Sequence, residues 1–509
     1  MKINTPIPEK GRGGGREQLI AALAFALLAV CFVLLASDTT SPLFATVPYR
    51  IVSADSPTFI VIGRYWLTEG ALPYTELFDQ KGPIPFLLNG LGWLLSGSAN
   101  GICVVQSLFL FACLLLLYRS CRERFSPRGA VGILAFFFLE LVLLYGLGNT
   151  VEEYNLPVMA LCLWGFVRYL HGLYEQGRVE HAPGWAFVYG LGMAFFLLNR
   201  PSDAAPVGIG VLCIGIGLLR RGAGRNLGQN LLAGLAGLAA LILPFVLYFA
   251  AHGALADFWY GAIGFNLVYA ANDTAFWLTE TTWKSAVKLG FYCLPLLGSL
   301  VTALLAARKK QWLRTALWAG IGVYGLLFYT LSRGYPHYLI TFLPLTAAVA
   351  CEGRDLLADA GEPLRRSLRR AGLCLLAVTL LLALVQERKY FSDSDFRWKE
   401  LPRYDYDVLI EQIPAEDRDQ VLLLNCLSSV YLRHDIRPCC RYFSFQDWQA
   451  RFSQDMMDRM AAEFSRGKAR WILASGPAEA PLQRVLEEGY TPVAREGNYV
   501  LYERKQEKF

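Results

Sequence analysis

Apolar runs of about 20 residues recur along this 509-residue chain, and they restrict its fold more than any other feature. A helix needs about 20 apolar residues to cross a hydrocarbon core of roughly 30 Å. Only 18% of the residues are charged, whereas roughly 25% is usual in soluble domains. The sequence therefore predicts an all-α polytopic membrane protein, to which a soluble region is attached.

The apolar runs predict about eleven transmembrane helices. We expect these spans at residues 18–36, 100–118, 129–147, 155–171, 185–199, 204–219, 227–250, 286–306, 313–331, 337–351 and 371–386. The apolar segment 84–96 is shorter, and its length suits a helix that lies at the membrane interface.

The positions of Lys and Arg give the predicted spans an orientation. These residues gather in the loops 119–128, 220–225, 308–314 and 353–370, and cytoplasmic loops carry such an excess. With a cytoplasmic N-terminus and eleven spans, all four loops lie inside, while the aromatic and acidic loops lie outside. Counting 84–96 as a crossing would reverse every later loop. We therefore expect a multi-pass cell-membrane protein whose C-terminus is extracytoplasmic.

This topology divides the chain into three predicted regions. Residues 1–17 form a basic cytoplasmic lead, residues 18–386 form the transmembrane domain, and residues 387–509 form an extracytoplasmic domain. Within the transmembrane domain, the two long outer loops are 37–99 and 251–283. The second of these loops is rich in aromatic residues, and we expect it to form an interfacial belt with a short helix.

Residues 387–509 have the pattern of a small α/β domain. The runs QVLLLNC and RWILASG have the length and composition of buried strands, and Gly497 centres a predicted hairpin. A region of this length is usual for one domain. Cys426, Cys439 and Cys440 lie here, so a disulfide among them is one alternative, with a connectivity that the sequence leaves open.

The first outer loop contains the densest group of acids, bases and aromatic residues, within 55–85. Its pattern is Asp-x-x-x-Phe, then Gly-x-x-Pro-Tyr, then Phe-Asp-x-Lys-Gly-Pro. The residues in that pattern are Asp55, Phe59, Gly70, Pro73, Tyr74, Phe78, Asp79, Lys81, Gly82 and Pro83.

This loop resembles the corresponding loop of the GT-C superfamily of polyprenyl-phosphate-sugar glycosyltransferases. The resemblance is nearest to the branch, similar to glycosyltransferase family 39, that contains protein O-mannosyltransferases and the lipid A aminoarabinose transferase. It implies a GT-C type membrane domain over about residues 1–390, with interfacial helices in the long first outer loop and a small soluble α/β domain at the C-terminus. Two later motifs also fit: Glu152-Glu153-Tyr154 and Arg333-Gly-Tyr-Pro-His337-Tyr338.

The resemblance implies an enzyme that moves a sugar from a polyprenyl-phosphate-linked donor to an acceptor on the outer face of the membrane. The acceptor would be a cell-envelope glycan, glycolipid or protein, and no nucleic acid is expected as a partner. A lipid donor also fits a chain without a nucleotide-binding motif. Ser56 follows Asp55 where the best-known members have a second acid. This departure leaves the participation of a divalent metal open, and no other cofactor is implied.

The resemblance makes Asp55 the expected general base. A carboxylate there could accept the proton of the acceptor hydroxyl and stabilise positive charge at the anomeric carbon. The alternative is a helix N-cap, since Asp55 precedes Ser-Pro-Thr and an apolar run. Lys81 is expected to bind the donor phosphate, and Asp79 would orient Lys81 or act on the acceptor. The alternative for this pair is a turn with a weak surface ion pair.

Glu152 and Glu153 are adjacent, so a helix would direct them about 100° apart. We expect one of them to face the cavity, with Glu153 favoured as a second catalytic carboxylate and Glu152 as a substrate contact. The alternative is that both acids simply stabilise the beginning of a helix.

Arg200, Arg333 and His337 are the remaining cations predicted outside, and they are candidates for binding the donor phosphate. The alternatives are Arg side chains that snorkel to the interface and a His that only packs. Tyr74 and Tyr338 complete the predicted substrate contacts. Glu140 lies inside a predicted span, where we expect a neutral carboxyl group that is hydrogen-bonded between helices.

Two other functions compete with glycosyl transfer. A flippase or transporter of lipid-linked sugar predicts inverted repeats and broken helices in two matching halves, and no such repeat is evident in the sequence. A non-catalytic envelope-assembly protein predicts that Asp55→Asn leaves function intact.

Overall fold

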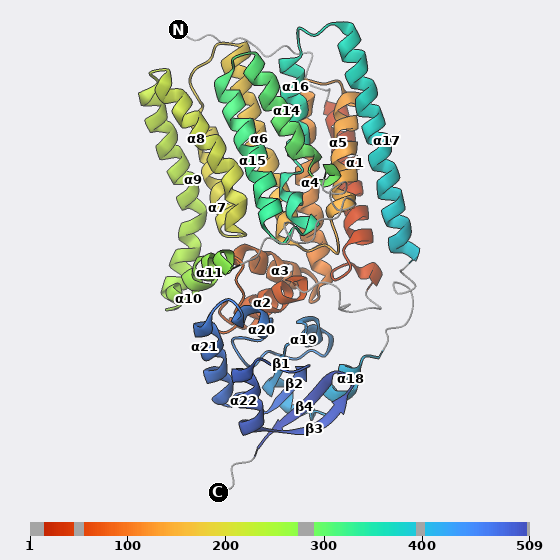
Figure 1. The fold of residues 1–509 in the computed structure, drawn as a ribbon, viewed down its shortest axis with the longest axis vertical. Helices are drawn as coiled ribbons and strands as arrows, with labels where there is room; N and C mark the ends of the chain where they lie inside the picture. The colour runs from red at the N-terminus through yellow and green to blue at the C-terminus, as the bar shows by residue number, and fades with distance from the viewer. Residues whose placement is uncertain (1–14, 45–54, 273–289, 393–402, 506–509) are drawn as a thin grey trace. The chain divides into compact units, whose positions relative to one another are not determined.

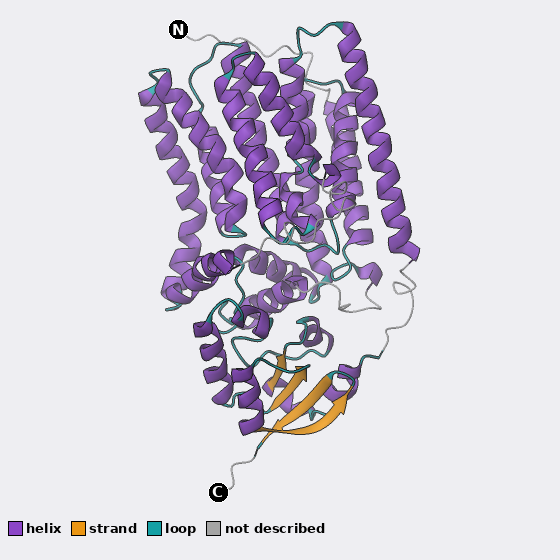
Figure 2. Ribbon diagram, in the orientation of Figure 1, coloured by secondary structure: helices purple, strands orange, loops and turns teal. Residues whose placement is uncertain are grey.

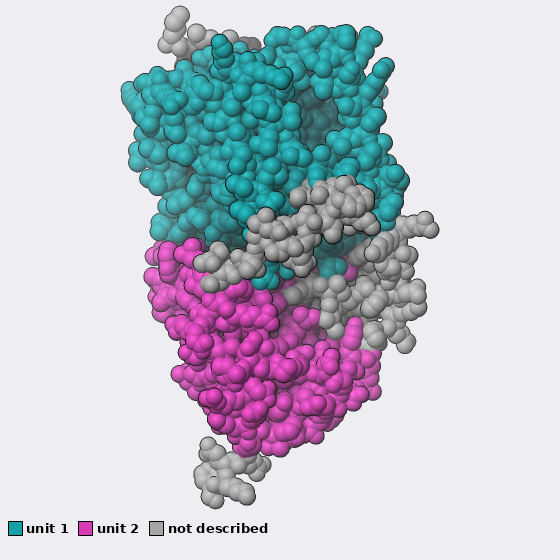
Figure 3. Space-filling model, viewed as in Figure 1, with its two compact units in different colours: residues 1–36, 106–244, 274–395 teal, residues 37–105, 245–273, 396–509 magenta. Residues whose placement is uncertain are grey.

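The computed structural model describes residues 15–44, 55–272, 290–392 and 403–505. The chain forms two compact units, and each unit combines stretches that lie far apart in the sequence (Figure 3). Unit 1 contains residues 1–36, 106–244 and 274–395. Unit 2 contains residues 37–105, 245–273 and 396–509.

Unit 1 is a bundle of helices (Figure 1). Its helices are α1 (Gly15–Ala36), α4 (Asn100–Arg122), α5 (Pro127–Leu144), α6 (Val151–Glu175), α7 (Pro183–Leu197), α8 (Ala205–Arg220), α9 (Gly224–Ala251), α14 (Leu294–Arg308), α15 (Trp312–Leu331), α16 (Leu345–Leu356) and α17 (Glu362–Ser392). The first residues of α4 and the last residues of α9 belong to unit 2. Two short 3-10 helices, η3 (Pro201–Ala204) and η5 (Pro336–Phe342), precede α8 and α16.

Within the described residues, each predicted span overlaps one of these helices. Seven helical segments in the described chain are long and apolar enough to cross a membrane: α1, α4, α5, α6, η3 with α8, α9 and α17. The protein is therefore a multi-pass membrane protein. The other four predicted spans fall on α7, α14, α15 and α16, which do not meet the same limits, so the count of eleven stays a prediction.

Close helix packing in unit 1 depends on small residues. A Cβ atom on Gly190 of α7 would lie 1.9 Å from the carbonyl oxygen of Gly234 in α9. One on Gly237 would lie 2.1 Å from the carbonyl oxygen of Phe187. Glycine at these positions lets the two backbones approach, as small residues do at helix interfaces within membranes.

Unit 2 contains helices from both predicted long loops. Residues 37–105 provide η2 (Pro42–Phe44), α2 (Asp55–Glu69) and α3 (Pro83–Ser96), and residues 245–273 provide α10 (Leu255–Trp259), the π-helix η4 (Tyr260–Gly264) and α11 (Phe265–Asn272). The expected helical structure in both loops is present. The aromatic residues Phe276 and Trp277 of the second loop lie outside the described residues.

The C-terminal part of unit 2 is an α/β structure, as the sequence predicts (Figure 2). Its sheet has the strand order β1-β2-β4-β3, with β1 parallel to β2 and the other two pairs antiparallel. The strands are β1 (Val421–Leu424), β2 (Trp471–Ser475), β3 (Tyr490–Glu496) and β4 (Tyr499–Arg504). The helices are α18 (Asp405–Ile410), η6 (Ala415–Gln420), α19 (Ser429–Arg433), α20 (Gln446–Ala450), α21 (Gln454–Ser465) and α22 (Ala480–Gly489). Both predicted strands and the hairpin at Gly497 are confirmed.

The structure answers one question that the sequence left open, and it differs from one local expectation. Cys426, Cys439 and Cys440 are free thiols, and no disulfide joins them. Glu140 is buried in α5, but neither of its carboxyl oxygens has a hydrogen-bond partner within the described chain. The expected interhelical hydrogen bond was wrong, because the groups that surround a buried side chain come from other helices and are not visible in its own sequence neighbourhood.

Candidate active site

The residues predicted from the first long loop lie at the beginnings of two helices in unit 2. Asp55 is the first residue of α2. Gly82 is the N-cap of α3 in an extended conformation and Pro83 is its first residue, a usual start for a helix. The segment with Asp79 and Lys81 therefore leads directly into α3.

Tyr74 is a buried side chain that holds this segment in place through a hydrogen bond. Its hydroxyl donates a hydrogen bond to the carbonyl oxygen of Lys81 at 2.9 Å, and its side chain is fully buried. The ring packs against the π-helix at Gly261, where a Cβ atom would lie 2.3 Å from the ring. Tyr74 has a φ of 70°, which is costly for a residue other than glycine. This arrangement supports a role for Tyr74 in positioning Lys81 rather than in contacting a sugar.

Two further hydrogen bonds hold the chain on either side of Asp79. The backbone N–H of Phe78 donates to the carbonyl oxygen of Arg441 at 2.8 Å. The side-chain amide of Asn266 in α11 donates to the carbonyl oxygen of Gln80 at 2.6 Å. The path of the loop is thus fixed by residues from the other two stretches of unit 2.

Asp79 is the most perturbed carboxyl group of this loop. Its side chain is 3% exposed, and its Oδ2 accepts the backbone N–H of Lys81 at 3.4 Å. Burial raises its pKa to about 6, the charge of Lys81 lowers the pKa, and the carboxylate of Asp55 raises it. The three residues therefore form one electrostatic group, which we call the loop cluster (Asp55, Asp79 and Lys81). A carboxyl pKa near the operating pH is what proton transfer requires.

A second group of charges lies in unit 1, and we call it the Arg200 cluster (Glu152, Arg200 and Asp203). Arg200 binds Asp203 through two hydrogen bonds, Nε to Oδ2 at 3.0 Å and Nη2 to Oδ1 at 2.7 Å. Its Nη1 donates to the carboxylate of Glu152, in the first turn of α6. The side chains of Glu152 and Asp203 are almost fully buried, and that of Arg200 is 13% exposed.

Neutral polar groups complete the contacts of Asp203. Its Oδ2 accepts hydrogen bonds from Nδ2 of Asn155 at 2.6 Å and from Oγ1 of Thr341 at 3.3 Å. The amide of Asn199 donates in turn to Oδ1 of Asn155 at 2.7 Å. Three of the five N–H donors of Arg200 bond to carboxylates of the protein, so only two are left for other partners.

Aromatic rings from α15 and η5 cover the Arg200 guanidinium. The guanidinium carbon lies 4.5 Å from the ring centroid of Tyr338 and 5.3 Å from that of Phe328, within cation–π range. The ring of His337 lies next to Tyr338, with centroids 4.9 Å apart. Arg333 lies on the same connection between α15 and α16 and is partly exposed. The structure thus brings Arg200, Glu152 and Tyr338 together, with His337 adjacent.

Glu153 has different partners from its neighbour Glu152. Its Oε1 accepts a hydrogen bond from Nε2 of Gln106 at 2.9 Å, and the same Nε2 donates to the hydroxyl of Tyr145 at 3.2 Å. The side chain of Glu153 is buried. The two adjacent acids therefore face separate groups, as the helical geometry predicts.

Sequence reasoning did not select Asp203, Asn155 or Gln106. Asp203 had a usable signal, because it lies three residues after Arg200 and Pro201 between them begins a short helix, where i,i+3 side chains meet. Asn155 and Gln106 had none, since neutral amides inside apolar segments do not indicate their partners. Within the described ranges, no group of three or more His, Cys, Asp and Glu side chains gathers as a metal site.

Comparison with known proteins identifies the fold. No family model and no curated protein matches the chain. Among solved structures, ArnT from Cupriavidus metallidurans in complex with undecaprenyl phosphate is similar, with 16% identity, a TM-score of 0.54, and coverage of 96% of this chain and 98% of that one. The apo state of the same protein gives a TM-score of 0.55 at 16% identity and the same coverage. AglB, an oligosaccharyltransferase from Archaeoglobus fulgidus, has 12% identity and a TM-score of 0.46, with 96% of this chain and 74% of that one covered.

The chain therefore has the GT-C fold, and the expectation drawn from the first long loop is confirmed at the level of the fold. The seven long apolar helices and the small C-terminal sheet agree with that assignment.

Proposed function

We propose that this protein is a membrane glycosyltransferase. It would move a sugar from a polyprenyl-phosphate-linked donor to a cell-envelope glycan, glycolipid or protein. The observation that carries this proposal is the loop cluster, in which two carboxyl groups and an ammonium interact and burial raises the pKa of Asp79 to about 6. The similar fold of ArnT, whose structure contains undecaprenyl phosphate, supports a lipid-phosphate carrier. The basic loops of the sequence support a reaction on the outer face of the cell membrane.

In the proposed reaction, the acceptor hydroxyl oxygen forms a bond to the anomeric carbon. The bond between that carbon and the phosphate oxygen breaks, and its electron pair stays on the lipid phosphate. The hydroxyl proton moves to the carboxylate of Asp55, which acts as general base. Lys81 stabilises the negative charge that the departing phosphate gains. Asp79 keeps the ammonium of Lys81 in place or assists at the acceptor.

The Arg200 cluster has a different role in this proposal. Because Arg200 is bound to Asp203 and Glu152, we assign it to positioning rather than to direct capture of the donor phosphate. Arg333 and His337, on the connection between α15 and α16, remain proposed ligands of the donor phosphate, and Tyr338 remains a proposed substrate contact. Glu153 remains the proposed second carboxylate.

The test uses the full-length protein in lipid nanodiscs with undecaprenyl-phosphate-linked monosaccharides that carry a radiolabel in the sugar. Transfer of label to a cell-envelope extract is measured. We expect transfer by the wild type and a loss of about 100-fold or more with Asp55→Asn and with Lys81→Ala.

Asp458→Asn is the matched control, because Asp458 is an exposed acid of α21 that bonds only to exposed Gln454 in the described structure. This variant should keep the wild-type rate. Full activity in both Asp55→Asn and Lys81→Ala, in folded protein, would refute the assignment.

A further inference from the structure

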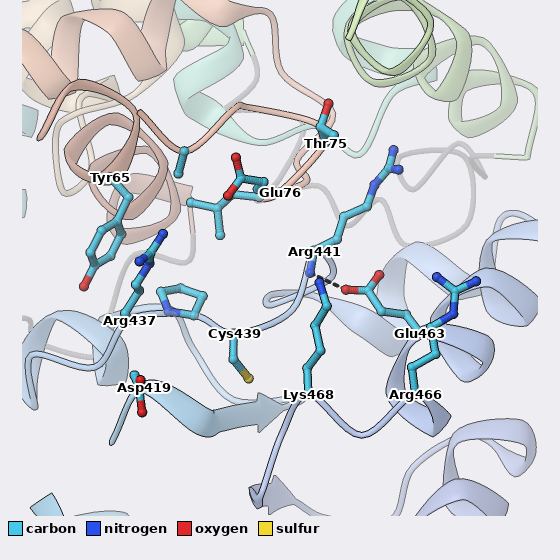
Figure 4. Close-up of a pocket in the computed structure, with 13 residues that line it drawn as sticks. Tyr65, Thr75, Glu76, Asp419, Arg437, Cys439, Arg441, Glu463, Arg466 and Lys468 are labelled. Atoms are coloured by element: carbon cyan, nitrogen blue, oxygen red, sulfur yellow. Dashed lines mark hydrogen bonds between the residues drawn. The ribbon is translucent and has the colours of Figure 1, made fainter. Parts of the chain in front are cut away.

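Unit 2 contains a cavity of ≈ 430 Å³ that no residue of the loop cluster lines (Figure 4). Its walls come from the end of α2 and the chain that follows, from residues 437–441, and from the chain at the end of α21. Its volume lies in the range of about 300–1,000 Å³ that is usual for small-molecule sites. The cavity is therefore large enough for a ligand of its own.

Four basic side chains line this cavity: Arg437, Arg441, Arg466 and Lys468. Two of them already have partners, since Arg437 pairs with Glu69 at 3.1 Å and Arg441 pairs with Asp257 at 2.8 Å. Arg466 and Lys468 are exposed and make no ion pair with any described residue. Positive charge at this end of the cavity is thus available to a ligand.

Three carboxylates line the same cavity: Glu76, Asp419 and Glu463. Glu76 accepts the backbone N–H of Leu72 at 2.9 Å, and Glu463 accepts the backbone N–H of Arg441 at 2.5 Å. In Figure 4 the side chains of Glu463 and Lys468 both extend toward the backbone of Arg441. A carboxylate accepts hydrogen bonds but cannot donate them. It repels a bare inorganic anion, but it accepts hydrogen bonds from a ligand that has hydroxyl groups.

A ligand that satisfies both sets of groups needs an anionic substituent and several hydroxyl donors. We propose that this cavity binds an anionic sugar residue of the acceptor. Its phosphate or carboxylate would face Arg466 and Lys468, and its hydroxyls would donate to Glu76, Asp419 and Glu463. The identification of this sugar as part of the acceptor rests on the proposed glycosyl transfer, whereas the binding itself does not.

The modification rate of Cys439 reports whether a ligand occupies the cavity, because this thiol lines the cavity and is partly exposed. The adjacent Cys440 is buried. Full-length protein in nanodiscs is treated with N-ethylmaleimide, and the rate of Cys439 modification is followed by mass spectrometry. The probes are glucose 6-phosphate, glucuronate, glucose and inorganic phosphate. Saturation-transfer NMR with the same probes gives a second reading that is independent of thiol reactivity.

We expect glucose 6-phosphate or glucuronate to protect Cys439 at concentrations at least about tenfold lower than glucose or inorganic phosphate. Glucose lacks the negative charge, and inorganic phosphate lacks the sugar hydroxyls. The comparison of the two anionic sugars distinguishes a phosphate from a carboxylate ligand. Equal protection by glucose would show that the ligand needs no anionic group. Equal protection by inorganic phosphate would show that it needs no sugar. Either result would overturn the proposed ligand class. No protection and no NMR transfer would overturn the proposal as a whole.

Variants then locate the site. The double variant Arg466→Ala/Lys468→Ala should weaken binding of the anionic sugar by about tenfold or more, the loss that 1.4 kcal/mol represents. The control Arg484→Ala/Arg495→Ala removes the same charge from exposed positions of α22 and β3 and should bind normally. An equal loss in both double variants would show that only net charge matters and would overturn the site.

A failure of this inference can be told apart from a failure of the proposed function. Asp55→Asn should abolish sugar transfer and leave protection of Cys439 unchanged. Arg466→Ala/Lys468→Ala should raise the KM for the acceptor without changing the KM for the lipid donor. If ligands protect Cys439 but the wild type transfers no sugar, the proposed glycosyltransferase function is refuted and the proposed binding site in the cavity stands. Transfer with a normal acceptor KM in the double variant would refute the assignment of the bound sugar to the acceptor and leave the glycosyltransferase proposal intact.

Discussion

The loop cluster of unit 2 and the Arg200 cluster of unit 1 contain the same kinds of groups, two carboxylates and one cation. The two clusters differ in how these charged groups are hydrogen-bonded. In the Arg200 cluster, the guanidinium is hydrogen-bonded to both carboxylates, and Asp203 accepts two more bonds from neutral groups. In the loop cluster, the hydrogen bonds of buried Asp79 come from the backbone at Gln80 and Lys81, the latter at 3.4 Å, and burial raises its pKa to about 6. Removal of one partner from a saturated buried ion pair destabilises a structure, whereas a poorly solvated carboxyl group is able to exchange a proton near neutral pH.

The largest expected effect separates the two clusters by rate. Asp55→Asn should lower kcat by about 10²- to 10⁴-fold, the range for loss of a general base, and leave the unfolding temperature within error of the wild type. The measurements are single-turnover transfer from the labelled lipid donor and thermal unfolding in nanodiscs. A variant that loses activity only because it unfolds would contradict a catalytic role for Asp55.

The next effect separates them by stability. Arg200→Ala leaves Glu152 and Asp203 as uncompensated buried carboxylates, and removal of one partner from a buried pair costs about 3–5 kcal/mol. We expect a marked fall in the unfolding temperature. The control Arg459→Ala breaks an exposed pair with Asp455 and should change stability by less than about 1 kcal/mol. An Arg200→Ala protein that unfolds normally but fails to bind donor would reverse our assignment of this residue.

A third prediction concerns the pH dependence of Asp79. Because burial raises the folded pKa of Asp79 to about 6, above its ordinary value of 3.8, the folded state holds the proton more tightly than the unfolded state. This contribution to stability is fully present below about pH 4 and is lost as the pH rises through 6, for about 3 kcal/mol in total.

Asp79→Asn should therefore be more stable than the wild type at pH 7 and should lack this slope between pH 4 and 6. If ionised Asp79 takes part in transfer, wild-type activity rises over the same pH range in which stability falls, and the variant loses that rise. Unfolding curves and rates at matched pH values check both. Identical pH profiles for the two proteins would exclude Asp79 from the loop cluster.

The smallest effect concerns the support of the loop cluster. Tyr74→Phe removes the hydrogen bond to the Lys81 carbonyl and keeps the buried ring, at a cost of about 1–3 kcal/mol for an acceptor left unsatisfied. We expect a modest fall in stability and a higher KM for the lipid donor, with little change in the KM for the acceptor. Equal changes in both KM values would indicate a general loosening of unit 2 instead.

Much of the fold could be predicted because its signals are local. Apolar runs identified the helices of unit 1, and the runs at Val421–Leu424 and Trp471–Ser475 identified two paired strands. The loop cluster was also predictable, since Asp79 and Lys81 lie two residues apart within a motif of the family pattern. The count of membrane crossings was not settled in the same way, because α7 and α14 have only 15 residues each.

The remainder depends on contacts between distant parts of the chain. The second carboxylate partner of Arg200, Glu152, comes from α6, and the neutral partners of Asp203 come from α6 and η5. These contacts join distant parts of the sequence, so no local pattern predicts them. The burial of Tyr74 likewise depends on Phe249 and Phe258, whose rings lie 5.6 Å and 5.8 Å from it. The same limit explains why the hydrogen bond expected for Glu140 was wrong.

The hydrogen bonds on either side of Asp79 have a consequence for biosynthesis. Phe78 and Gln80 leave the ribosome early, but the residues that hold them, Arg441 and Asn266, are translated long afterwards. A nascent chain that has already inserted its first helices therefore cannot yet order the loop that carries its reactive groups. Ordering of the loop cluster would therefore wait until Arg441 has been translated, so a chain that stops before that residue would lack this support for Asp79.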